Sequence, residues 1–226
     1  MVFFRRENMN ENMKISMAVI KRLPRYYRYL GDLLDKDIMR ISSKELSLRM
    51  GITASQIRQD LNNFGSFGQQ GYGYNVEMLY YEIKRILGLD KVYSLILIGT
   101  GNIGQALAKY PNFNKRGFNF VALFDDDPKI IGEIVGNFKV KDVSLIVDFL
   151  NENHVDIAVL ALPGHASVKV AHVLEQTDIK GIWNFSNADL KMPNHIIVEN
   201  VHLTDSLMTL SYKINEDEIL RRVDIY

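Results

Sequence analysis

The feature that most constrains this chain is a glycine-rich turn directly after a run of apolar residues. Residues 95–104 read LILIGTGNIG, which ends in the pattern Gly99-x-Gly101-x-x-Gly104. In such a pattern the first glycine permits a tight turn after a strand, the second lets a pyrophosphate approach the backbone, and the third lets the next helix pack closely on the strand. The phosphates then bind to N–H groups at the start of that helix. The pattern predicts an α/β fold of the Rossmann type that binds a dinucleotide.

An acidic residue stands where such a fold recognises a ribose. Asp125 closes the next apolar run, 118–124, and lies 21 residues beyond Gly104. A carboxylate at this position accepts hydrogen bonds from a ribose diol and repels a 2′-phosphate. Two further acids follow it, and no Lys or Arg occurs before Lys129. We therefore expect the cofactor to be NAD(H) rather than NADP(H).

The rest of the C-terminal part alternates between strand and helix patterns. The segment 155–162 predicts a buried strand that ends at Pro163-Gly164. Strands that alternate with helices form a parallel sheet, and ligands bind beyond the carboxyl ends of its strands. The turn at 161–165 is therefore expected to line the same crevice as the glycine turn, unless it is only a connecting loop. The expected cofactor contacts are Gly99, Thr100, Gly101, Asn102, Ile103, Gly104, Asp125, Pro163 and Gly164.

Composition limits the class of protein. The chain has 226 residues, of which 47% are hydrophobic, and this is enough for a core in each of two modest domains. No apolar stretch reaches the roughly 18 residues of a membrane span, and the N-terminus lacks the apolar centre of a signal peptide. The absence of cysteine excludes disulfides, thiolate nucleophiles and cysteine zinc sites. We expect a cytoplasmic protein without a membrane segment or a metal.

Charge is distributed unevenly along the chain although the net charge is zero. Residues 1–85 contain 14 Lys or Arg and 9 Asp or Glu, whereas residues 86–226 contain 13 and 18. A basic N-terminal part indicates binding to a polyanion, and ordinary scatter of surface charge is the alternative.

The basic part carries the pattern of a helix-turn-helix. Residues 22–34 have helical apolar spacing, and capping patterns at Ser42-x-x-Glu45 and Thr53-x-x-Gln56 open two further short helices, the first of which ends at Gly51. Two short helices joined by such a turn indicate a helix-turn-helix. The glycine-rich segment that follows, 64–76, predicts the hairpin of a winged helix.

The second of these helices has two different faces. Ala54, Ile57 and Leu61 share one face and are expected to point inward. The opposite face is rich in side chains that read base edges, although an ordinary solvated face has a similar composition. The expected DNA contacts, on this face, on the wing and among the basic residues, are Arg22, Arg25, Lys44, Ser55, Arg58, Gln59, Asn62, Gln69, Gln70 and Tyr72.

At this point the chain resembles the Rex redox-sensing transcriptional repressors of bacteria, from Met13 to about Tyr212. The resemblance implies a homodimer that binds a palindromic operator when the NADH/NAD+ ratio is low and leaves it when NADH binds. It is carried by RYL at 28–30, SSKEL at 42–46, TASQIRQDL at 53–61, FGSFGQQGYGY at 64–74, GTGNIG at 99–104 and GIWNF at 181–185. The domains expected from it are an extension (1–12), a winged helix (13–85), a Rossmann domain (86–202) and a dimerisation helix with a tail (203–226).

The resemblance also implies a role for the last helix. In the family this helix is exchanged between subunits and packs between the two domains of the partner, and Leu207, Met208 and Leu210 would suit such contacts. The same residues could also close the helix onto its own core. Many family members carry an acid at the helix start that pairs with an arginine of the DNA-binding domain in the NADH-bound form. Here the corresponding switch residues are His202 or Asp205 with Arg28.

Two other functions compete with this interpretation. An NAD-dependent dehydrogenase with a helical N-terminal extension needs a general acid or base, but the one Tyr-x-x-x-Lys pair, Tyr80 and Lys84, precedes the glycine turn. The five histidines form no paired or metal-spaced cluster. A protein that binds coenzyme A is the second competitor, and Asp125 argues against its 3′-phosphorylated ribose. We therefore expect a regulator without catalytic residues.

Overall fold

The computed structural model describes residues 15–64, 68–69 and 72–223. Its contacts divide the chain into two compact units, Met1–Lys91 and Val92–Tyr226, and each unit is described by itself. The sequence places the boundary between the two domains after residue 85. The last helix of the first unit ends at Ile86, and residues 87–91 also belong to that unit.

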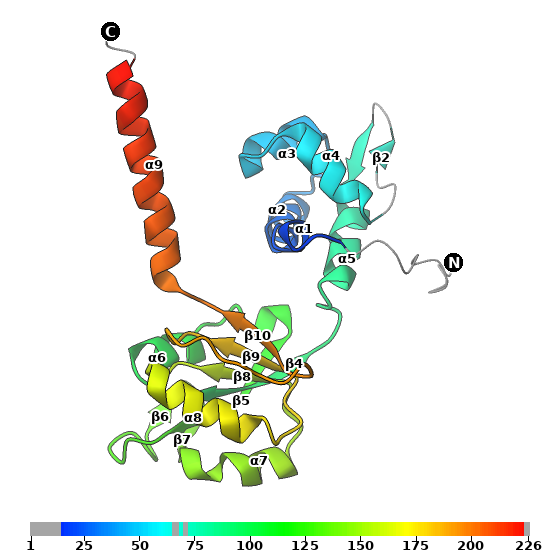
Figure 1. Cartoon of the computed structure of the whole chain (residues 1–226). Coiled ribbons are helices and arrows are strands. Elements are labelled where there is room, and N and C mark those ends of the chain that lie inside the picture. The colour runs from blue at the N-terminus through cyan, green and yellow to red at the C-terminus, as the bar shows by residue number, and fades with distance from the viewer. Residues whose placement is uncertain (1–14, 65–67, 70–71, 224–226) are drawn as a thin grey trace, which may run out of the picture. The chain divides into compact units, whose positions relative to one another are not determined.

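The first unit has the elements of a winged helix (Figure 1). β3 pairs antiparallel with both β1 and β2, so the order in this small sheet is β1-β3-β2. The β2–β3 hairpin follows the second helix of the helix-turn-helix, as the glycine pattern predicts. The elements are α1 (Met17–Ile20), α2 (Leu23–Leu34), β1 (Arg40–Ile41), α3 (Ser43–Met50), α4 (Ala54–Asn62), β2 (Gly68–Gln69), β3 (Gly73–Asn75) and α5 (Val76–Ile86).

The predicted caps define the ends of α3 and α4. Ser42 and Glu45 form a complete capping box, and Gly51 ends α3 in the left-handed conformation. Thr53 accepts a hydrogen bond from the backbone of Gln56 at 3.1 Å and so begins α4. The side chain of Gln56 does not complete a second box, because it donates to Asp60 instead.

The second unit is a seven-stranded α/β sheet in the order β10-β9-β8-β4-β5-β7-β6. All pairings are parallel except β6 with β7, which are antiparallel. The elements are β4 (Tyr93–Ile98), α6 (Asn102–Ala108), a 3₁₀ turn (Asn114–Arg116), β5 (Phe118–Asp125), β6 (Ile134–Val135), β7 (Phe138–Asp142), a second 3₁₀ turn (Val143–Leu145), α7 (Ile146–Glu152), β8 (Ile157–Leu160), α8 (Gly164–Leu174), β9 (Gly181–Asn184), β10 (Ile197–Asn200) and α9 (Leu203–Val223). This is the α/β fold that the strand and helix patterns predict.

Alternate residues of β4 belong to two separate cores, one on each face of the sheet. Ile96 and Ile98 pack with Ile146 of α7 and Leu174 of α8. On the other face, Leu95 and Leu97 pack with residues of α6 and of β5. Figure 1 shows α7 and α8 along one face of the sheet. The connection from β9 to β10, residues 185–196, contains no helix, and its residues Leu190 and Met192 pack on the face that α7 and α8 cover.

The long helix α9 is apolar on two opposite sides rather than along one stripe. At 100° per residue, Leu207 and Leu210 lie on one side and Met208 on the other. All its large apolar side chains from 203 to 219 are at least half exposed, so the described chain covers neither side. The alternative, that this helix closes onto its own core, is therefore wrong for the single chain. None of the helices in the described ranges is both long and apolar enough to cross a membrane.

A buried carboxylate joins the starts of three parallel strands. Asp156, directly before β8, accepts hydrogen bonds from the backbone and hydroxyl of Ser94 in β4 at 3.0 and 3.2 Å. Its other oxygen accepts from Lys180, directly before β9, at 2.7 Å, and lies 3.2 Å from His154. Burial opposes ionisation, but the hydrogen bonds from Lys180 and Ser94 outweigh it and lower the pKa of Asp156 to about 2.

Asp156→Asn should destabilise the second unit in a pH-dependent way. Because its folded pKa is depressed, ionised Asp156 contributes its full stabilisation above its unfolded pKa of about 4 and loses it as the pH falls toward 2. We expect Asp156→Asn to lower the free energy of unfolding, measured with urea, by about 1 to 3 kcal/mol at pH 7. This difference from the parent should become progressively smaller as the pH is lowered below about 4. The exposed Asp178→Asn is the matched control. A difference between Asp156→Asn and the parent that is constant with pH would contradict this account.

Candidate nucleotide and DNA sites

The glycine turn has the backbone geometry that a dinucleotide site requires. Gly99 has a φ of 94°, and a Cβ on it would lie 2.5 Å from the carbonyl oxygen of Ala161. A Cβ on Gly104 would lie 1.9 Å from the carbonyl oxygen of Gly99, so α6 approaches the end of β4 as closely as the pattern predicts. A Cβ on Gly101 would meet no atom within 4 Å. The space beside Gly101, at the N-terminus of α6, is thus open for a phosphate.

Asp125 braces this turn from the end of β5. One of its carboxylate oxygens accepts hydrogen bonds from the backbone and hydroxyl of Thr100 at 2.6 and 2.7 Å, and the other accepts from the backbone of Asp127 at 3.0 Å. Burial opposes ionisation of Asp125, but these hydrogen bonds outweigh it and hold its pKa below the ordinary value. Asp125 is therefore charged at neutral pH.

The second expected loop lies beside the first. The backbone of Ala161 donates to Ile98, and Gly99 approaches Ala161, so the ends of β4 and β8 meet at one edge of the sheet. Pro163 is the N-cap of α8, and Gly164 packs against Ala188. The structure therefore brings the two loops together. Of the predicted cofactor residues, Gly99, Thr100, Gly104 and Asp125 are buried and Gly164 is half-buried, whereas Gly101, Asn102, Ile103 and Pro163 are exposed.

A polar network at the same edge of the sheet was missed from the sequence. Asn184, at the end of β9, is fully buried and donates to the backbone of Ala188 and to the side chain of Asn200, each at 2.8 Å. Its oxygen accepts from the backbone and hydroxyl of Ser186. The sequence feature that could have predicted this network is the asparagine at the end of the GIWN strand, 181–184. The network fixes the loop after β9 at the carboxyl edge of the sheet.

The helix α4 presents the predicted outer face. Ser55, Arg58, Gln59 and Asn62 are all exposed, while Ile57 and Leu61 are buried in the core of the first unit. Arg58 donates to the hydroxyl of Ser43 on α3 at 3.0 Å.

Other predicted DNA contacts have different surroundings. Arg25, Lys44 and Tyr72 are exposed, whereas the guanidinium of Arg22 is held by Asp60 at 2.7 Å. A phosphate contact for Arg22 stays a prediction. Gln70 lies outside the described residues, and Gln69 is described only as a residue of β2.

The predicted switch residues belong to different units. Arg28 is exposed on α2 in the first unit. His202 is half-buried just before α9, and Asp205 is exposed in its first turn. Contact between these residues stays a prediction.

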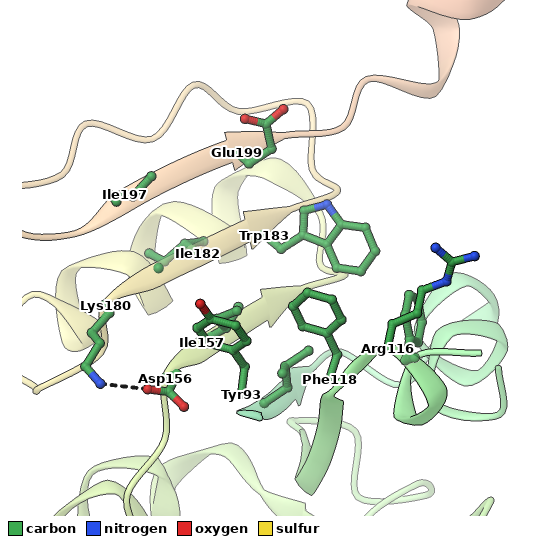
Figure 2. Close-up of a pocket in the computed structure, with 13 residues that line it drawn as sticks. Tyr93, Arg116, Phe118, Asp156, Ile157, Lys180, Ile182, Trp183, Ile197 and Glu199 are labelled. Atoms are coloured by element: carbon green, nitrogen blue, oxygen red, sulfur yellow. Dashed lines mark hydrogen bonds and ion pairs between the residues drawn. The ribbon is translucent and has the colours of Figure 1, made fainter. Parts of the chain in front are cut away.

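A further pocket of the second unit is a different site. It has a volume of about 600 Å³ and is lined by the starts of β4, β8 and β9, at the edge of the sheet opposite the glycine turn. Figure 2 shows the side chains of Tyr93, Phe118 and Trp183 converging there, with the Lys180–Asp156 ion pair at one end. Its lining is almost wholly apolar, which does not suit a pyrophosphate. This pocket is therefore not a candidate for the dinucleotide site.

The dehydrogenase alternative loses its candidate catalytic pair. Tyr80 lies on α5 of the first unit, where it stacks on Tyr27 with ring centroids 4.5 Å apart and their hydroxyls hydrogen-bond at 2.7 Å. Tyr80 thus belongs to the packing of the winged helix. Among the residues that the structure describes, no group of three or more His, Cys, Asp or Glu side chains could hold a metal ion.

Comparisons with known proteins agree with this division of the chain. A family model described as "Putative DNA-binding protein N-terminus" matches residues 14–62, and one described as "CoA binding domain" matches residues 90–188. The redox-sensing transcriptional repressor Rex of Thermoanaerobacter pseudethanolicus is 54% identical over 215 residues, which cover 95% of this chain and 96% of that protein.

Solved structures of a relative have the same fold. The crystal structure of RSP in complex with β-NAD+ and operator DNA has a TM-score of 0.84 at 54% identity, and covers 94% of this chain and 98% of RSP. The complex of RSP with β-NADH has a TM-score of 0.85 at 51% identity, and covers 93% and 99%. RSP itself is described as a Rex-family repressor. The chain therefore belongs to the Rex family of redox-sensing transcriptional repressors.

Proposed function

We propose that this protein is a transcriptional repressor that binds a palindromic operator as a homodimer and is released from it by NADH. One observation carries the proposal: a single chain joins a winged helix with an exposed recognition face to a braced glycine turn that is open beside Gly101. The relative RSP has been solved with operator DNA and NAD+, and separately with NADH. Coenzyme A and catalytic turnover are the less favoured alternatives, and a DNA-binding repressor belongs in the cytoplasm.

At the nucleotide site, the proposed contacts are the exposed backbone of the glycine turn and the second loop. Gly101 and Asn102 present N–H groups at the start of α6 toward the pyrophosphate. Asp125 would accept one ribose hydroxyl while it keeps its hydrogen bonds to Thr100. The loop at Pro163-Gly164 lies on the side where the nicotinamide of an extended dinucleotide would reach.

At the DNA site, α4 is the proposed recognition helix in the major groove. Arg58 can bond a guanine in a bidentate way, and Gln59 and Asn62 can bond adenine. Arg25 and Lys44, both exposed, would bind phosphates.

We propose that α9 holds the homodimer together. Its large apolar side chains lie on two opposite sides and are uncovered in the single chain. A helix with this pattern suits insertion between two surfaces, and a second copy of the chain would supply them. The pairing of Arg28 with His202 or Asp205 would then join the two kinds of domain in the NADH-bound form.

Operator release tests the proposed function directly. A palindromic operator is selected from random DNA with the full-length protein, labelled, and titrated without nucleotide, with NAD+ and with NADH. We expect two chains to bind each operator, NAD+ to preserve the complex and NADH to dissociate it. Operator binding that does not change when NADH is added, or equal affinity for operator and random DNA, would contradict the proposal.

Two glycine substitutions should separate nucleotide binding from folding. Gly101→Ala adds a methyl group that meets no protein atom, so we expect unchanged thermal stability but at least about tenfold weaker NADH binding, because the methyl occupies phosphate space. Gly104→Ala places its methyl against the Gly99 carbonyl, so it should lower the stability of the unit itself. Calorimetric titration and thermal unfolding measure the two effects. Equal NADH affinity for Gly101→Ala and the parent would place the phosphates elsewhere.

Asp125→Ala should change which nucleotide is preferred. The substitution removes an acceptor for the ribose diol and a charge that repels a 2′-phosphate, so NADH should bind more weakly and the preference for NADH over NADPH should shrink. Thr100→Val is the control, because it removes one bond of the brace and keeps the carboxylate. If Asp125→Ala has the same ratio of NADH affinity to NADPH affinity as the parent, Asp125 only stabilises the turn and does not select the ribose.

A further inference from the structure

Asp60 is a fully buried carboxylate on the recognition helix. Arg22, the N-cap residue of α2, binds it with two parallel hydrogen bonds: Nε donates to Oδ2 and Nη2 to Oδ1, each at 2.7 Å. This is the bidentate arrangement in which an arginine fixes both the distance and the orientation of a carboxylate.

Two further donors complete the site. The hydroxyl of Tyr26, on the first turns of α2, donates to Oδ2 at 3.0 Å, and Nε2 of Gln56, one turn earlier on α4, donates to Oδ1 at 2.8 Å. Each oxygen of Asp60 therefore accepts two hydrogen bonds, which fills the capacity of a carboxylate. Burial opposes ionisation of Asp60, but the bonds from Arg22, Gln56 and Tyr26 hold its pKa below the ordinary value, so it is charged at neutral pH.

The network lies directly behind the face that would read DNA. Asp60 is two residues beyond Arg58, so its side chain leaves α4 about 200° around the helix from that of Arg58. The apolar contacts of Ile57 and Leu61 also hold α4 in the core, but apolar contacts have no preferred direction and tolerate small slides and rotations. The hydrogen bonds to Asp60 are directional, so they define the rotation and position of α4 relative to α2.

We propose that Asp60 is a positioning residue, which with Arg22 fixes the pose of the recognition helix and thereby the selectivity for operator over random DNA. The proposal rests on the proposed DNA binding. It gives Arg22 a role different from the phosphate contact expected from the sequence. A buried ion pair adds little to net stability and is better suited to defining one arrangement among several.

The two possible roles of Arg22 predict different results for Arg22→Lys. Lysine keeps the positive charge that a phosphate contact needs, but it cannot form two parallel bonds to a carboxylate. If Arg22 positions α4, operator binding should weaken about tenfold, and random-DNA binding should stay within about twofold, since the electrostatic attraction is kept. If Arg22 binds phosphate, both affinities should stay close to those of the parent.

The experiment compares full-length Arg22→Lys and Asp60→Asn with the parent on operator and random DNA, without nucleotide, over a range of salt concentrations. In both variants the selectivity for operator over random DNA should fall about tenfold, with an unchanged salt dependence. Arg25→Ala, at an exposed basic residue, should instead weaken binding to both operator and random DNA. It should also reduce the slope of log affinity against log salt concentration by about one. Asp32→Asn, an exposed aspartate of α2, is the matched control and should behave as the parent.

Hydrogen exchange of the DNA-free protein keeps the proposal testable even if the protein binds no operator. In both Arg22→Lys and Asp60→Asn, amides of 54–62 should exchange faster, while those of α5 should stay protected. Equal weakening on operator and random DNA would overturn the proposal. So would unchanged selectivity, or exchange that rises equally in α4 and α5, which would mean that the ion pair only stabilises the fold.

Discussion

The close approach of α6 to the end of β4 is the constraint on which the nucleotide site depends. Only glycine at 104 lets the helix start against the carbonyl of Gly99, and only with that start does the first turn of the helix face the space beside Gly101. Asp125 then holds the turn through its hydrogen bonds to Thr100. Burial disfavours the charged carboxylate, but the hydrogen bonds that it accepts offset this cost. The site is therefore largely formed before any nucleotide binds, and the protein needs to spend little binding energy on ordering it.

The DNA-binding unit uses the same physical device. In both units a buried aspartate accepts several hydrogen bonds and fixes a helix that presents its outer groups to a ligand: Asp125 fixes the turn before α6, and Asp60 fixes α4. Because NADH and NAD+ differ only at the nicotinamide, a response to their ratio must begin at that ring, beyond the carboxyl edge of the sheet. It must end in a small change in the separation of two recognition helices, which on B-DNA is about 34 to 36 Å or a multiple of it.

Local patterns in the sequence predicted local structure well, because caps and glycine turns depend on a few neighbouring residues. The capping box at Ser42 and the stop at Gly51 are in the structure, and so is the close packing at Gly104. Long-range pairing could not be predicted. Arg22 and Asp60 are 38 residues apart, and in the sequence each has the properties of an ordinary surface charge. Whether the apolar residues of α9 are covered could not be predicted either, because that depends on what the rest of the chain packs against the helix.

The central claim is that the nucleotide site and the DNA site are linked through one dimeric protein, and reciprocity tests it most directly. If NADH weakens operator binding by some factor, saturating operator must weaken NADH binding by the same factor. The measurement is the dissociation constant of NADH, by fluorescence titration, for the free protein and for the protein saturated with operator. The account predicts weaker NADH binding in the complex, by the factor found for operator release. An NADH affinity that is the same with and without operator would contradict it.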